Sequence, residues 1–213
     1  MYKLIGMSGV GSRKNRVCWM LEEINADYEA IDTVPHSDIA LAVNPSGVLP
    51  ALRDGNNVVT DSAAICTYLA DTNPGFGFSF PSGTAKRAEM EGWSYMVTSD
   101  LEGPIWAAIR QLSLPEEERL DQVLTLAYAD WEKSVIALDK KLGGNQYVMG
   151  DSFTVPDLFF GHVGFWAKFY DMPVKSASVQ AYFDRLIERP AFKKTMHQDL
   201  IASAAMLEKG IEL

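Results

Sequence analysis

The chain has 213 residues, of which 47% are hydrophobic, and it carries a formal net charge of −9. This length and apolar fraction allow one large domain or two small ones, with a sizeable core. The acidic balance argues against nucleic acid or an anionic membrane surface as the main partner. No stretch approaches the about 18 apolar residues of a membrane span, and the first residues lack a signal-peptide layout. We therefore expect a cytoplasmic protein.

The cysteines and histidines do not indicate a metal site. Cys18 and Cys66 form no Cys-x-x-Cys pair, and we expect both to be small buried hydrophobic residues. The histidines are scattered along the chain without metal-ligand spacing. No metal is therefore expected.

The beginning of the chain predicts alternating strands and helices. Residues 2–7 read as a strand, residues 13–24 as a helix with one apolar face, and residues 28–33 as a second strand. A short helix is expected within residues 35–43. The β-α-β order predicts that the two strands run parallel.

Residues 44–69 combine a turn, a hairpin and a helix start. Turn formers at residues 44–47 are followed by strand-like runs on either side of the turn Asp54-Gly55-Asn56. Pro50 beside a strand predicts an edge strand or a special turn, with a cis bond as one option. An exposed backbone there can pair with an extended peptide. Asp61-Ser62 opens a helix, and these residues can cap it or hold the charged end groups of a small ligand.

The rest of the chain predicts helices only. A linker rich in Pro, Gly and Ser covers residues 73–83, and residues 84–110 read as one long helix, bent near Gly103-Pro104. A second helix extends from residue 115 to about residue 142. The remaining predicted helices begin at Thr154, which has an N-cap hydroxyl and Asp157 three residues later, and cover residues 178–188 and 190–209.

Two motifs carry a resemblance to a known family. They are Pro45-x-Gly47-x-Leu49-Pro50-x-Leu52 followed by Asp61-Ser62-x-Ala64-Ile65-x-x-Tyr68-Leu69, and the capping-box segment Gly150 to Asp157. In order and spacing they resemble the cytosolic glutathione S-transferases. The resemblance implies an α/β plus all-α protein: a thioredoxin-like, glutathione-binding domain at residues 1–76 and an all-helical bundle domain at residues 84–213. It also implies a homodimer.

The resemblance further implies a reaction. Glutathione is a co-substrate, no other cofactor is needed, and the glutathione thiolate attacks a small hydrophobic electrophile or an organic peroxide. A free cysteine thiol has a pKa of about 8.5, so a hydroxyl near the start of the first helix must favour the anion. Ser12 is the first candidate and Ser8 the second, while Tyr2 is disfavoured. The resemblance puts the hydroxyl position of several classes at Ser12 or one residue before it, where Gly11 stands, and Ser12 can also be a simple helix cap.

The same resemblance assigns the contacts to glutathione. Asp61 would pair with the γ-glutamyl ammonium, and Ser62 would bind the neighbouring carboxylate. Arg13 would contact the ligand or remain a solvated charge. Val48 replaces the Lys or Gln that often reaches the glycyl carboxylate, so that contact is lost or moved. The expected glutathione-binding residues are Arg13, Val48, Leu49, Pro50, Asp61 and Ser62.

The electrophile pocket is expected along the long helix, at Leu101, Trp106 and Arg110, although apolar residues at this spacing also suit a core. The alternative function is a non-catalytic, transferase-like protein that binds a ligand or partner, which Gly11 and Val48 favour. A thiol-disulfide reductase would need a cysteine near Ser12, and none is there.

Overall fold

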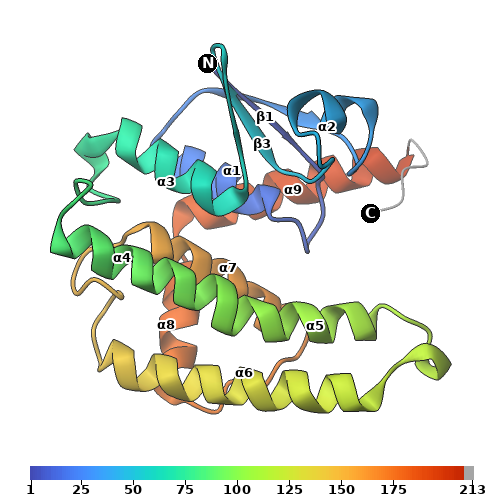
Figure 1. The fold of residues 1–213 in the computed structure, drawn as a ribbon, viewed down its shortest axis with the longest axis vertical. Helices are drawn as coiled ribbons and strands as arrows, with labels where there is room; N and C mark the ends of the chain where they lie inside the picture. Colours follow the sequence, from blue (N-terminus) through green and yellow to red (C-terminus); the bar gives the residue numbers. More distant parts are fainter. Residues whose placement is uncertain (209–213) are drawn as a thin grey trace. The chain divides into compact units, whose positions relative to one another are not determined.

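A computed structural model describes residues 1–208 and contains a four-stranded sheet and a set of helices (Figure 1). The elements of the first part are β1 (Tyr2–Gly6), α1 (Lys14–Glu23), β2 (Tyr28–Asp32), α2 (Asp38–Val43), β3 (Ala51–Asp54), β4 (Asn57–Thr60), α3 (Ser62–Thr72) and η1 (Pro74–Phe76). The second part contains α4 (Ala85–Met96), η2 (Val97–Leu101), α5 (Glu102–Leu112), η3 (Glu116–Glu118), α6 (Asp121–Leu142), α7 (Val155–Phe169), α8 (Ala177–Ile187) and α9 (Pro190–Glu208). A mixed sheet followed by helices confirms the expected fold class.

The described residues form two compact units. The first combines Met1–Ser79 with the segment from Glu188 onward, and the second covers Phe80–Ile187. Helix α9 thus belongs to the unit that contains the sheet. The division into domains 1–76 and 84–213 stays a prediction, and Lys209, the expected end of the last helix, lies outside the described residues.

The sheet has the strand order β2-β1-β3-β4. β1 is parallel to β2, as predicted, and antiparallel to β3, with Ile5 opposite Ile31 and Leu4 opposite Leu52. β3 is therefore an interior strand, and the expectation of an edge strand after Pro50 was wrong. The other predicted option, a special turn with a cis bond, is confirmed, because the Leu49–Pro50 bond is cis and Pro50 precedes the first residue of β3. Its missing N–H therefore interrupts no ladder.

Helices α1, α3 and α9 form the core of the first unit together with the sheet. α1 packs against β1, α3 and α9, and α2 lies apart from them at the other side of the sheet (Figure 1). Trp19 on α1 is fully buried and meets Phe192 on α9 edge to face, with ring centroids 4.9 Å apart. Arg189 donates two hydrogen bonds to the Glu23 carboxylate, which also fixes the start of α9 to α1.

Helix α7 is the centre of the second unit. Nearly all of its residues are buried, which is typical of a helix surrounded by others. It begins with the predicted capping box: the backbone N–H of Thr154 donates to Asp157 Oδ2 over 2.8 Å. Tyr182 on α8 and the backbone of Val148 donate to the other oxygen of Asp157.

The long helix expected over residues 84–110 is interrupted earlier than predicted. α4 ends at Met96, a π-helical turn covers η2, and α5 starts at Glu102. The helix continues from η2 into α5 without a gap, so the N–H that Pro104 lacks leaves the Asp100 carbonyl without its intrahelical donor, and this carbonyl accepts a hydrogen bond from the Ser134 hydroxyl instead. The irregular turn therefore lies one turn before Pro104. Within residues 1–208, no helix is both long and apolar enough to cross a membrane.

Candidate functional site

A cavity of about 530 Å³ in the first unit collects the residues that the family motif singled out. It is lined by Arg13, Asn44, Ser46, Val48, Leu49, Pro50, Thr60, Asp61 and Ser62. All the residues expected to bind glutathione are among them. Asn44, Ser46 and Thr60 were not predicted. The sequence could have indicated them, because each lies directly beside one of the two halves of the motif.

Asp61 connects the cavity to the start of α3. Its Oδ1 accepts hydrogen bonds from the backbone N–H groups of Ala63 (2.8 Å) and Ala64 (3.3 Å), so Asp61 is the N-cap of this helix. Its Oδ2 makes no hydrogen bond with the residues that the structure describes. Asp61 has a φ of 71°, a left-handed value that Asp tolerates better than most residues. One oxygen therefore stabilises the helix, and the other remains available to a ligand.

The two neighbouring segments offer further hydrogen-bonding groups. Ser62, the first residue of α3, lines the cavity, and its hydroxyl has no partner among residues 1–208. The backbone N–H and C=O of Leu49 are likewise unpaired within the described chain. Free backbone groups beside a cavity can pair with an extended peptide, and a helix N-terminus attracts a carboxylate.

The rim of the cavity is held by Asn44. Its Nδ2 donates to the carbonyl of Val48 over 2.8 Å, and its Oδ1 accepts from the backbone N–H and the hydroxyl of Ser46. The Val48 side chain is 56% exposed and provides no donor. Among the lining residues that the structure describes, Arg13 alone carries a positive charge.

The two candidate hydroxyls are both engaged within the protein. The Ser12 hydroxyl donates to the carbonyl of Met7 over 2.5 Å and accepts from the backbone N–H of Lys14, the first residue of α1, over 3.1 Å, although Arg13 is the N-cap residue of this helix. Ser8 is fully buried, donates to Asp32 over 2.6 Å and accepts from Lys14 Nζ over 2.6 Å. Ser12 adjoins Arg13, which lines the cavity, whereas neither serine lines it.

The cysteines are not suited to reaction. Cys18 and Cys66 are both buried, as expected. Burial raises the pKa of the Cys18 thiol to about 11. Burial also raises the pKa of Cys66, and the nearby Arg16 only partly opposes it. Because the thiolate is the reactive form, both remain inert thiols at neutral pH.

The residues expected to bind the electrophile lie in the second unit. Leu101 is fully buried at the end of η2 and belongs to the core. Trp106 is partly exposed and stacks on Trp166 with ring centroids 5.9 Å apart, and Arg110 is exposed one turn further along α5. Their role toward an electrophile stays a prediction. Within the described residues, no group of three or more His, Cys, Asp or Glu side chains gathers to hold a metal ion.

Several known proteins that are similar to this chain are glutathione S-transferases. A family model described as the glutathione S-transferase N-terminal domain matches residues 11–76. Glutathione S-transferase 3 of Zea mays is 29% identical over 91% of this chain and 92% of its own length. Glutathione S-transferase GstB of Escherichia coli strain K12 is 27% identical over 85% of this chain and 91% of its own.

Solved structures agree with the sequence relatives. A sphingomonad glutathione S-transferase, determined in complex with glutathione, matches with a TM-score of 0.78 at 26% identity, over 92% of this chain and 98% of that one. A glutathione transferase of Methylococcus capsulatus has the same fold, with a TM-score of 0.81 at 23% identity over 94% of this chain and 100% of that one. The chain belongs to the cytosolic glutathione S-transferase family. Its sheet is the thioredoxin-like part of that fold, and its second unit is helical, as in those relatives.

Proposed function

We propose that this chain is a glutathione transferase that binds reduced glutathione in the cavity at Asp61 and presents the thiolate to a small hydrophobic electrophile or an organic peroxide. One observation supports this above all. A carboxylate, a hydroxyl at a helix start and an unpaired backbone segment border the same cavity. Glutathione carries an ammonium, a carboxylate and a peptide backbone that match these groups in kind. A homodimer is part of the same proposal.

The γ-glutamyl end of glutathione is assigned to the start of α3. Asp61 Oδ2 pairs with the ammonium, while Oδ1 keeps its bonds to the helix. The Ser62 hydroxyl and backbone N–H bind the carboxylate, which the positive end of the helix dipole also favours. The cysteinyl N–H and C=O pair with the backbone of Leu49, against Pro50.

The thiolate is assigned to the start of α1. The positive charge of Arg13 favours the anion over the neutral thiol, and Ser12 is the hydroxyl that donates to the sulfur. For this the Ser12 proton has to turn from the carbonyl of Met7 to the ligand. Ser8 comes second, because it is fully buried and donates to Asp32. In conjugation, the thiol proton goes to solvent, sulfur bonds to the electrophilic carbon, and the leaving group departs with its electron pair.

Substitution of Ser12 tests this assignment. Glutathione-dependent conversion of chlorodinitrobenzene and of cumene hydroperoxide is measured for the wild type, Ser12→Ala and Ser12→Thr. We expect Ser12→Ala to lower kcat by about tenfold to a hundredfold, because a hydrogen bond made to the developing anion is lost. Ser12→Thr keeps a hydroxyl and retains most of the activity.

Controls separate the chemistry from helix capping. Loss of the cap alone lowers stability by about 1 kcal/mol, which thermal unfolding of both variants reports. Unchanged kcat in Ser12→Ala would refute the role of this hydroxyl. Glutathione binding by a wild type that turns over none of the substrates would favour the non-catalytic, ligand-binding alternative.

A second candidate function is the reduction of disulfides by glutathione. The disulfide-bond oxidoreductase YghU of Escherichia coli strain K12 is 28% identical over 84% of this chain and 69% of its own length. In that reaction two glutathione molecules reduce one disulfide and are themselves joined as glutathione disulfide. Hydroxyethyl disulfide is therefore included in the same assays, and its turnover without any turnover of the electrophile would select this function.

A further inference from the structure

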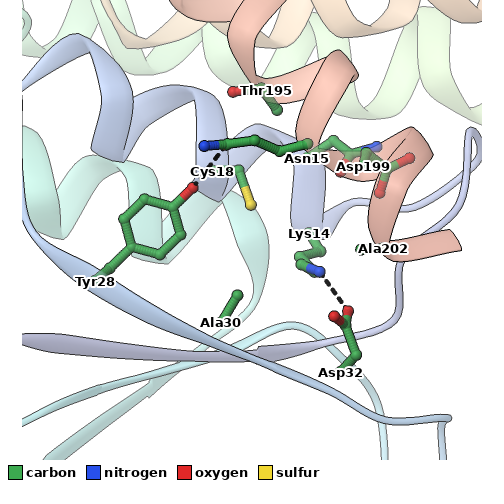
Figure 2. Close-up of a pocket in the computed structure, with 10 residues that line it drawn as sticks. Lys14, Asn15, Cys18, Tyr28, Ala30, Asp32, Thr195, Asp199 and Ala202 are labelled. Carbon is green, nitrogen blue, oxygen red and sulfur yellow. Dashed lines mark hydrogen bonds and ion pairs between the residues drawn. The ribbon is translucent and has the colours of Figure 1, made fainter. Parts of the chain in front are cut away.

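A second cavity lies in the first unit, separate in its residues from the proposed glutathione site. It encloses about 270 Å³ between α1, β2 and α9 (Figure 2). It is lined by Lys14, Asn15, Cys18, Tyr28, Ala30, Asp32, Thr195, Gln198, Asp199 and Ala202. None of these residues lines the cavity at Asp61. The reaction proposed above uses none of them, so their arrangement requires another explanation.

Three hydrogen-bond acceptors of this cavity are buried without a partner. Asn15 is 2% exposed, Thr195 1% and Asp199 4%. Asn15 Oδ1, Thr195 Oγ1 and Asp199 Oδ2 make no hydrogen bond with any residue from 1 to 208. Leaving one buried polar atom unpaired costs about 1–3 kcal/mol. Three such atoms around one cavity are therefore expensive to keep unless water or a ligand pairs them.

Two of the three acceptors, on Asn15 and Asp199, lie close together, and the Thr195 hydroxyl lies further along the cavity (Figure 2). Thr195 and Asp199 are one turn apart on the same side of α9, and the Asn15 side chain lies next to Asp199 (Figure 2). The orientation of Asn15 is fixed, because its Nδ2 donates to the carbonyl of Gly9 over 3.2 Å. The same Gly9 donates its backbone N–H to Asp199 Oδ1 over 3.0 Å. Hence each acceptor belongs to a side chain or helix that is already held in place.

The charges around the cavity do not balance. Lys14 Nζ pairs with Asp32 Oδ1 at 2.5 Å, so these two charges offset each other. Asp199 is the remaining charged group, and Lys14, whose positive charge lowers the pKa of Asp199, already pairs with Asp32. The cavity therefore has an excess of one negative charge when Asp199 is ionised. A buried carboxylate is stabilised only by a paired cation or by hydrogen bonds.

Much of the remaining wall is apolar, although Gln198, whose Oε1 accepts a hydrogen bond from the Tyr28 hydroxyl, also lines the cavity. Cys18, Ala30, Ala202 and the ring of Tyr28 present carbon and sulfur to the cavity. A water molecule would pair the acceptors but would neither offset the charge of Asp199 nor fill this apolar part. A bare metal ion would leave most of the 270 Å³ unfilled.

We propose that this cavity is a binding site for a small organic cation with a primary ammonium group, whose N–H donors pair with Asn15 Oδ1 and Asp199 Oδ2. An ammonium group has donors and no acceptor, which matches the two neighbouring unpartnered oxygens in kind and leaves a further donor for water in the cavity. The alkyl part lies against Ala30 and Ala202. Because Gly9 belongs to the segment between β1 and α1, the ligand also steadies the loop that leads to Ser12 and Arg13.

The test uses the whole chain and no glutathione, so its result is independent of the proposed transferase function. Butylammonium chloride is titrated into the wild type at constant ionic strength, and binding is followed by calorimetry and by amide chemical shifts. We expect saturable binding with shifts at Gly9 and at the Asn15 side-chain amide. Butyltrimethylammonium, which has the same charge but no N–H donor, is expected not to bind.

Matched variants locate the site. Asp199→Asn removes the charge and should weaken butylammonium binding at least about tenfold, since a charge-assisted hydrogen bond is lost. Glu208→Gln removes the same charge from an exposed position of the same helix and should leave binding unchanged. Ala202→Leu fills the cavity and should abolish binding, and circular dichroism checks that each variant folds.

Three outcomes of the butylammonium titrations would overturn the proposal, and a salt control adds a fourth. They are no saturable binding of butylammonium by the wild type, equal binding by wild type and Asp199→Asn, and equal binding of the trimethyl analogue. Chemical-shift changes caused by potassium chloride but not by butylammonium would also overturn it, because they would identify an inorganic ion site.

Discussion

Two aspartates of the first unit show how local surroundings give one residue type different uses. Asp61 and Asp199 each bind backbone N–H through one oxygen and leave the other oxygen unpaired within residues 1–208. Asp61 is exposed at its cavity, so its free oxygen stays hydrated until a ligand arrives. Asp199 is buried, and desolvation raises the pKa of its carboxyl group. Its ionised form therefore destabilises the folded protein.

This difference predicts that Asp199→Asn stabilises the protein at neutral pH. The asparagine keeps an oxygen for the Gly9 N–H and removes the buried charge, so we expect a gain of about 1 kcal/mol in the free energy of unfolding. The pKa of Asp199 is higher in the folded than in the unfolded state, so its protonation favours folding. This contribution is complete below the unfolded pKa of 3.8 and is lost as the pH rises through the folded value.

The advantage of Asp199→Asn should therefore shrink as the pH falls through the raised pKa of Asp199. Urea unfolding of the wild type and of Asp199→Asn across a series of pH values measures this difference in the free energy of unfolding. Glu208→Gln is the exposed control. An advantage that stays constant over the whole series would contradict the assignment of a raised pKa to this group.

At the scale of elements, the start of α7 illustrates a cap that also joins helices. Asp157 accepts hydrogen bonds from the Thr154 backbone and hydroxyl, from the Val148 backbone and from the Tyr182 hydroxyl. Burial raises the pKa of Asp157, and these hydrogen bonds oppose the rise. The residue thus connects the start of α7 with α8 and with the preceding loop.

We predict that Asp157→Ala lowers the free energy of unfolding by about 3–5 kcal/mol, since several buried donors lose their acceptor together. Chemical unfolding monitored by tryptophan fluorescence measures the loss. Asp151→Ala, at an exposed position just before the cap, should change stability by less than about 0.5 kcal/mol. A similar loss in both variants would show that the cap has no special role.

The elements also show what the sequence can and cannot predict. Strand and helix order followed from periodicity, and the cap at Thr154 from residue types at fixed spacing. The irregularity was expected at Pro104 itself and lies one turn earlier, in η2, because a proline disturbs the ladder at the carbonyl four residues before it while the apolar pattern continues through that turn. The interior position of β3 was missed because pairing with β1 depends on residues far apart in sequence.

At the scale of the whole molecule, the two cavities differ in how far they could be predicted. Most of the cavity at Asp61 comes from residues 44–62, a contiguous stretch whose spacing already marks it. The cavity at Asp199 is assembled from α1, β2 and α9, and no local spacing connects these segments. The hydrogen bond from the Ser12 hydroxyl to the Met7 carbonyl could not be predicted from the sequence either, because it depends on the path of the loop after β1.

The central claim is that the cavity at Asp61 binds glutathione, and a calorimetric titration with reduced glutathione tests it most directly. It is carried out on the wild type, on Asp61→Asn and on the double variant Asp61→Ala, Ser62→Ala. Asparagine caps helices as well as aspartate does, so Asp61→Asn isolates the loss of charge. We predict micromolar to millimolar binding by the wild type, weaker binding by Asp61→Asn and none by the double variant. No detectable binding by the wild type, or equal binding by all three proteins, would contradict the claim.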